Sequence, residues 1–197
     1  MKLPIFPLPI YLLPGGITRL RIFEQRYLKM VRDANKTKGF VILYSKGDDQ
    51  SNDINWGSWV EIIDFNQQSD GVLSIDVMCK SLVEIDDNSI IENTIAGNND
   101  KLLIASVTLK EHWHDISSVQ IPEMLIQQLK HFFISNPDFD ELYKVRYFDD
   151  PLWVCRRWLE LVPVNILHKR YFVDELSFQN AVGFLESLLL ANSKELD

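Results

Sequence analysis

The sequence lacks an apolar run long enough to cross a membrane. A membrane-spanning helix needs about twenty consecutive, mostly apolar residues, and the 197-residue chain contains no such stretch. The N-terminal end also lacks the basic segment, apolar core and cleavage site of a signal peptide, and Pro4, Pro7 and Pro9 would interrupt a helix there. We therefore expect a cytoplasmic protein with no membrane partner.

Cysteine and histidine are scarce. The two cysteines, Cys79 and Cys155, are far apart in apolar segments, which predicts buried free thiols rather than a disulfide or a nucleophile. Of the four histidines, two fall in the sequence His112-Trp-His114-Asp115. Two imidazoles and one carboxylate are a weak metal signature, so we predict a structural or surface role for them and no metal.

Sequence signatures of catalysis are also missing. The chain has neither the Gly-x-x-x-x-Gly-Lys-Ser/Thr loop that cradles phosphates nor the Gly-x-Ser-x-Gly nucleophile elbow. The adjacent carboxylate pairs at 48–49, 86–87 and 149–150 lie in turn-like segments and are interpreted as solvated turn residues or helix caps. These absences favour a binding module over an enzyme and predict no cofactor.

Charge is unevenly distributed along the chain. The net charge is −8 overall, yet residues 1–32 carry six basic side chains and one acidic one, whereas residues 45–100 carry twelve acidic and two basic ones. The acidic middle argues against a broad surface that follows nucleic-acid phosphates. It leaves a small basic cluster, Arg19, Arg21 and Arg26, near the N-terminus.

Residues 3–34 combine two strand patterns and one helix pattern. The apolar segment 3–13 contains three prolines, which cannot donate to a strand ladder, so it is predicted to be an edge strand or extended chain across a sheet. Pro14-Gly15 indicates a turn. In segment 17–23, apolar and basic residues alternate as in a half-buried strand. A helical face then follows, formed by Phe23, Tyr27, Met30, Val31 and Ala34.

The rest of the chain separates into a β-rich part and a helical part. Strands are predicted at 40–44, 56–65, 72–85, 89–96 and 101–113, with a hairpin turn at Asp70-Gly71. Helices are predicted at 121–133, at 150–162 with Asp150 as N-cap, at 165–172, and from 174 or 177 onward. The predicted fold class is α+β, with about six strands and one main helix in a β-rich subdomain, 1–116, followed by a small helical bundle, 117–197.

Four side chains are candidates for substrate contact. Arg26 and Tyr27 lie beside Glu24 at the start of the first helix, where they either orient one another or touch a ligand. Trp153 and Arg157 are spaced i, i+4, opposite much of the apolar stripe of their helix. They predict either an exposed cation–π pair or part of a peptide-binding groove between the barrel and the bundle.

The N-terminal motif resembles the opening of the substrate-binding domain of Lon-type proteases. The matching residues are Pro7, Leu8, Pro14, Gly15, Leu20, Ile22, Phe23, Glu24, Arg26, Tyr27 and Met30. The run 56–85 is similar to the next part of that domain, with Gly57, Glu61, Asp64 and Gly71 in place, and 151–190, which includes Lys169, is similar to its helical half. One departure is 78–81, where the family usually has Gly and Arg and this chain has neither.

The resemblance implies a PUA-like pseudo-barrel followed by helices, and a role in holding polypeptides. Lon proteases carry their ATPase and protease activities in later modules, so we expect a stand-alone, non-enzymatic module here. Its expected partners are unfolded or client polypeptides, with a protease as a further candidate, and its expected role is that of an adaptor or chaperone-like factor in proteolysis. The alternatives are an RNA-binding PUA-like domain, by fold analogy alone, and an enzyme with an unrecognised site.

Overall fold

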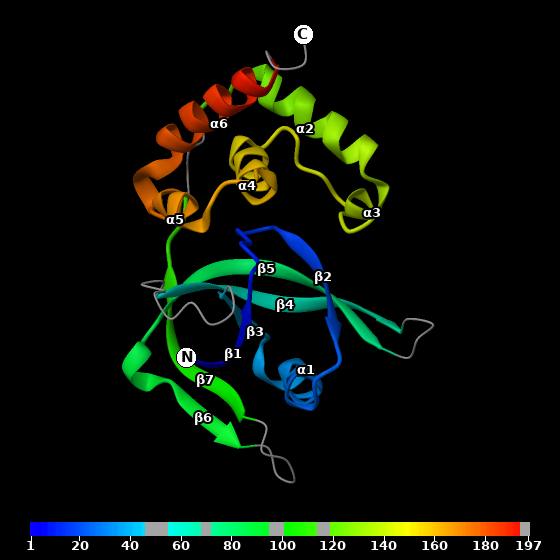
Figure 1. The fold of residues 1–197 in the computed structure, drawn as a ribbon, viewed down its shortest axis with the longest axis vertical. Coiled ribbons are helices and arrows are strands. Elements are labelled where there is room, and N and C mark those ends of the chain that lie inside the picture. The colour runs from blue at the N-terminus through cyan, green and yellow to red at the C-terminus, as the bar shows by residue number, and fades with distance from the viewer. Residues whose placement is uncertain (46–54, 68–71, 95–100, 114–118, 194–197) are drawn as a thin grey trace. The chain divides into compact units, whose positions relative to one another are not determined.

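The computed structural model describes residues 1–45, 55–67, 72–94, 101–113 and 119–193, and the chain divides into two compact units, Met1–Lys110 and Glu111–Asp197 (Figure 1). The predicted hairpin turn at Asp70-Gly71, together with His114 and Asp115, lies outside the described residues. No helix in the described ranges is both long and apolar enough to cross a membrane.

The first unit is a seven-stranded sheet with one α-helix. Its order is β2-β5-β4-β3-β1-β7-β6, and an additional pairing of β5 with β7 closes five of the strands into a barrel-like ring. The α+β class is therefore confirmed, and each of the seven strands overlaps a segment predicted to be a strand or extended chain. The elements are β1 (Lys2–Leu8), β2 (Ile17–Ile22), α1 (Gln25–Thr37), β3 (Phe40–Tyr44), β4 (Trp56–Gln67), β5 (Leu73–Ile85), the short 3-10 helix η1 (Asp87–Ser89), β6 (Ile91–Thr94) and β7 (Lys101–Lys110).

The prediction that the first strand lies at an edge is wrong, because β1 lies between β3 and β7. Its pairings are staggered: residues 2–5 pair with β7 and residues 5–8 pair with β3. Met1 and Val107 exchange both backbone hydrogen bonds. The backbone N–H and C=O groups of odd-numbered residues in β1 therefore point toward β7, and those of even-numbered residues point toward β3. The backbone nitrogen of Pro4 therefore points toward β3, which pairs only with residues 5–8, and that of Pro7 points toward β7, which pairs only with residues 2–5. Neither proline removes a hydrogen bond from the sheet.

The predicted turn at Pro14-Gly15 is confirmed, and it places β2 against β5. Gly15 has a positive φ of 79°, a conformation that glycine adopts without penalty. Its N–H donates to the Cys79 carbonyl, and the Cys79 N–H donates to the Gly16 carbonyl, both at 2.8 Å. In the segment that departs from the Lon pattern, Trp59 pairs with Ser81 and Val60 with Cys79, so a β-bulge forms there without a glycine.

Alternating apolar residues fill the interior of the first unit. The barrel core collects side chains from β1, β3, β5 and β7, and α1 packs against β1, β3, β4 and β7. Between β3 and β4 the packing is so close that a Cβ on Gly57 would lie 2.5 Å from Cγ1 of Val41. The buried core cluster consists of Leu3, Ile5, Val41, Val83, Ile85, Ala105 and Val107.

The second unit is helical. The side chain of Asp150 accepts a hydrogen bond of 2.8 Å from the Leu152 N–H, which confirms the predicted N-cap. The last helix buries an apolar face, made of Phe178, Val182, Leu185 and Leu189. The helices are α2 (Glu123–Ser135), α3 (Pro137–Asp140), α4 (Pro151–Leu161), α5 (Ile166–Lys169), η2 (Arg170–Phe172), η3 (Glu175–Ser177) and α6 (Phe178–Ser193).

Lys169, in α5, gives the second unit a pH-dependent stability. Burial lowers its pKa from 10.5 to about 8, against the opposing charge of Glu160. Between pH 8 and 10.5 the unfolded chain holds a proton that the folded chain has released, so the lysine's contribution to stability rises with pH across that window. Below pH 8 both states are protonated and this contribution is constant.

We therefore expect Lys169→Met to stabilise the protein most below pH 8. The difference in free energy of unfolding between the variant and the wild type should decrease by roughly 2–3 kcal/mol as pH rises to 10.5. Urea unfolding of both proteins from pH 7 to 10.5 measures the difference, and the methionine variant also serves as the control for all other titrating groups. A difference that does not change with pH would contradict the burial argument.

Candidate functional site

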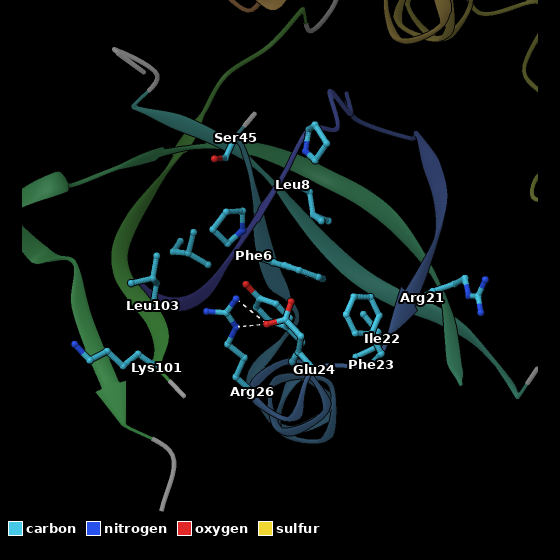
Figure 2. A pocket seen from close by; sticks show the side chains of 14 residues that line it. Phe6, Leu8, Arg21, Ile22, Phe23, Glu24, Arg26, Ser45, Lys101 and Leu103 are labelled. Carbon is cyan, nitrogen blue, oxygen red and sulfur yellow. Dashed lines mark hydrogen bonds and ion pairs between the residues drawn. The ribbon is translucent and has the colours of Figure 1, made fainter. Parts of the chain in front are cut away.

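A pocket of about 410 Å³ opens on the first unit, where β1 passes the junction between β2 and α1. Figure 2 shows Lys101 and Leu103 of β7 on one side and Arg21, Ile22 and Phe23 on the other. Most of the lining is apolar, and the charged side chains are three cations and one carboxylate. The lining residues are Ile5, Phe6, Pro7, Leu8, Pro9, Arg21, Ile22, Phe23, Glu24, Arg26, Tyr27, Ser45, Lys101 and Leu103.

An aromatic stack forms the rigid part of the pocket wall. The rings of Phe6, from β1, and Tyr27, from α1, have centroids 3.9 Å apart and are inclined at 29°. Both residues are buried. Burial raises the pKa of the Tyr27 phenol, and the charge of Arg26 acts in the opposite direction. The Tyr27 phenol is therefore uncharged at physiological pH.

Arg26 and Glu24 supply the polar part of the pocket. Nε of Arg26 donates to Oε2 of Glu24 at 2.7 Å, and its guanidinium lies 4.6 Å from the centroid of the Tyr27 ring (Figure 2). The backbone of Glu24 forms the N-cap of α1, but its side chain makes no capping bond. The three residues contact one another, and Arg26 and Tyr27 lie together in the pocket lining. A ligand contact by Arg26 or Tyr27 remains a prediction.

Phe23 belongs to the site, although the sequence analysis placed it on the buried face of α1. It precedes the helix and is 72% exposed, whereas Tyr27, Met30, Val31 and Ala34 of that face are buried. The strand alternation contained the correct signal: Ile22 points inward, so the next residue along the strand points outward. An exposed phenylalanine on a pocket wall is an available apolar contact for a ligand.

Trp153 and Arg157 are not part of this pocket. The guanidinium of Arg157 lies 5.6 Å from the Trp153 ring centroid, so the predicted cation–π contact exists, but the prediction that it is exposed is wrong. Trp153 is 4% and Arg157 0% exposed, because aromatic rings of the same unit, among them Phe133 and Tyr143, cover them. Their assignment to a binding groove remains a prediction.

The basic cluster near the N-terminus is largely neutralised. Arg19 makes a bidentate ion pair with Asp76, with distances of 2.7 and 2.8 Å. Arg26 is paired with Glu24. Of the three arginines that suggested a nucleic-acid surface, Arg19 is therefore held by a buried carboxylate, whereas the pair of Arg26 with Glu24 is partly exposed.

Both cysteines and His112 are buried. Neither cysteine forms a disulfide, as predicted, and burial raises the pKa of Cys155 to about 12, so its thiol stays protonated and unreactive. The His112 ring is buried, with Nε2 3.0 Å from the Phe172 carbonyl oxygen. Among the described residues no group of side chains is arranged to hold a metal ion.

Comparisons with known proteins place the chain among Lon domains. A crystal structure of a Lon N-terminal domain protein from Xanthomonas campestris is 26% identical, with a TM-score of 0.64, covering 96% of this chain and 98% of that one. The N-terminal domain of the Mycobacterium avium complex Lon protease shares the fold at 13% identity, with a TM-score of 0.58 and coverage of 94% and 96%. A search of curated proteins gives no match.

The family comparison covers most of the sequence. Residues 2–175 match the substrate-binding domain of the ATP-dependent protease La (Lon). That span includes the whole barrel-like unit, the pocket and α2 to α5. The chain belongs to the Lon substrate-binding domain family, and it is a substrate-binding module of that kind.

Proposed function

We propose that the chain binds unfolded client polypeptides through the pocket beside β1, as a non-enzymatic adaptor or chaperone-like factor in proteolysis. The observation that carries this proposal is the pocket itself. It combines the Phe6–Tyr27 stack, an exposed Phe23 and a few charged groups. A concave, mostly apolar surface with few polar groups suits an apolar side chain of a chain that has not folded.

The proposal predicts that Phe23→Ala weakens client binding. Removing an exposed aromatic wall should raise Kd by about tenfold, equivalent to about 1.4 kcal/mol, without unfolding the protein. Fluorescence anisotropy with labelled, reduced and carboxymethylated α-lactalbumin, which stays unfolded, measures the affinity. Circular dichroism checks that the fold is intact.

Phe65→Ala is the matched control, because Phe65 is also an exposed aromatic of the first unit, at 48%, but does not line the pocket. We expect its Kd to equal that of the wild type. Equal losses in the two variants would mean that the pocket is not the binding site. Absence of binding by the wild type at high micromolar concentration would refute the client-binding function.

The RNA-binding alternative has less support. Its basis was the cluster of Arg19, Arg21 and Arg26, and Arg19 is held in a bidentate ion pair by the buried carboxylate of Asp76. Affinity for nucleic acid depends on several phosphate contacts, and the strongly acidic segment 45–100 opposes a broad surface of that kind. We therefore favour a polypeptide client.

A further inference from the structure

The wall that β1 contributes to the pocket offers almost no backbone donors. Odd-numbered residues of β1 face β7, and that pairing ends at Ile5 and Leu103. The next residue facing the same way is Pro7, which has no N–H, and Pro9, with the next odd number, also lines the pocket. A peptide that added to this side of β1 as a new strand would find the Pro7 carbonyl but no donor there.

The side chains around that wall offer more than its backbone does. Phe23 and Leu103 supply apolar surface on opposite sides of the pocket, with Phe6 between them (Figure 2). Phe6 is stacked on Tyr27, which also lines the pocket. Because Phe23 is 72% exposed, an entering side chain would cover apolar surface that now faces water, which favours binding in proportion to the area covered.

The charges of the lining favour an acidic neighbour to that side chain. The lining contains three cations, Arg21, Arg26 and Lys101, and one carboxylate, Glu24, although the chain as a whole carries a net charge of −8. The ion pairs that hold Arg26 to Glu24 and Lys101 to Glu92 are partly exposed. Exposed pairs of this kind contribute only about 0–1 kcal/mol, so a client carboxylate can share these cations at little cost.

We propose that the pocket recognises client side chains and not client backbone: it takes one large apolar side chain that has a carboxylate beside it, and the client does not add to the sheet as a strand. This inference rests on the proposed function and specifies its substrate class.

N-methylation of a peptide separates the two modes of binding, because it removes backbone donors and leaves side chains in place. The probe is a fluorescein-labelled Ala/Ser peptide with one central Phe followed by Asp, titrated with the full chain. Two methylated peptides are compared, one with N-methyl groups on the odd-numbered residues and one with them on the even-numbered residues. We expect either change to alter Kd by less than about threefold. Replacing Phe with Ala should raise Kd about tenfold, and replacing Asp with Lys should raise it several-fold.

Each outcome of this titration decides something different. If the parent peptide binds and either set of N-methyl groups abolishes binding, the client adds to the sheet as a strand, for example along β2. The inference then fails, while the client-binding function stands. If unfolded α-lactalbumin binds but the parent peptide does not, one apolar side chain with a carboxylate is not the recognised unit. If neither binds, the proposed function itself fails. Phe23→Ala should weaken the parent peptide and Phe65→Ala should not.

Discussion

Replacing Gly39 with alanine is expected to lower the free energy of unfolding by about 3–5 kcal/mol. Gly39 links α1 to β3 with a φ of +94°, and a Cβ built there would lie 2.0 Å from the backbone carbonyl oxygen of Val60. Two costs therefore combine: a conformation that side chains rarely adopt and a collision with a backbone atom of β4 that cannot rotate away. Relief requires β3 and β4, both barrel strands, to separate.

Thermal unfolding followed by circular dichroism measures the effect, and we expect the melting temperature to fall by about 6–15 °C. Gly183→Ala is the control, because a Cβ at Gly183, inside α6, has no neighbour within 4 Å. Alanine is the better helix former there, so that variant should be more stable by up to about 1 kcal/mol. If Gly39→Ala has the same melting temperature as the wild type, β3 and β4 are less tightly packed than the structure indicates.

Local patterns predicted the elements of the first unit well, because each depends on nearby residues. The alternation of Leu20 and Ile22 with the arginines identified β2, and the spacing of Met30 and Val31 identified the buried face of α1. The neighbours of β1 were not predictable in this way. Its place between β3 and β7 depends on pairing with residues about a hundred positions away, such as Met1 with Val107, and no local period encodes that.

The candidate site was predicted in part, for a related reason. Arg26 and Tyr27 were identified within a continuous motif, and both line the pocket. Phe23 was wrongly assigned to the buried face of the first helix. It lies at the boundary between the strand and the helix, where its position fits both the strand alternation and the helical spacing. Lys101 and Leu103 were not identified at all, since β7 reaches the pocket only through the closure of the barrel-like ring.

Burial of a charge is the property that sequence spacing predicted least well, and Arg157 shows why. Its spacing from Trp153 correctly indicated a contact between the two, but whether that contact faces water depends on rings brought from other helices, such as Phe133 and Tyr143. The guanidinium is fully buried and makes two hydrogen bonds of 2.7 Å with the carboxylate of Glu160, which is itself 8% exposed. Removing one partner of such a pair is strongly destabilising, because the other charge is then buried without compensation.

Glu160→Gln is therefore expected to destabilise the second unit by about 3–5 kcal/mol, since it leaves the buried Arg157 charge without its counterion. Lys169, also buried, donates to the Glu160 carbonyl and would lose the same neighbouring negative charge. Urea unfolding at pH 7 measures the loss. Glu61→Gln is the matched control, because its pair with Lys80 is about 40% exposed on both sides and should contribute less than about 1 kcal/mol.

A double variant distinguishes a lost ion pair from a general packing defect. Arg157→Met combined with Glu160→Met removes both charges and keeps apolar bulk, so we expect it to recover most of the stability that Glu160→Gln loses. If the double variant is as unstable as the single one, the guanidinium is needed for its contacts with Trp153 and Tyr143 rather than for its charge. Because the pocket and its lining lie wholly in the first unit, client binding to folded Glu160→Gln protein should match that of the wild type, which would separate the stability of the helical unit from the function of the barrel.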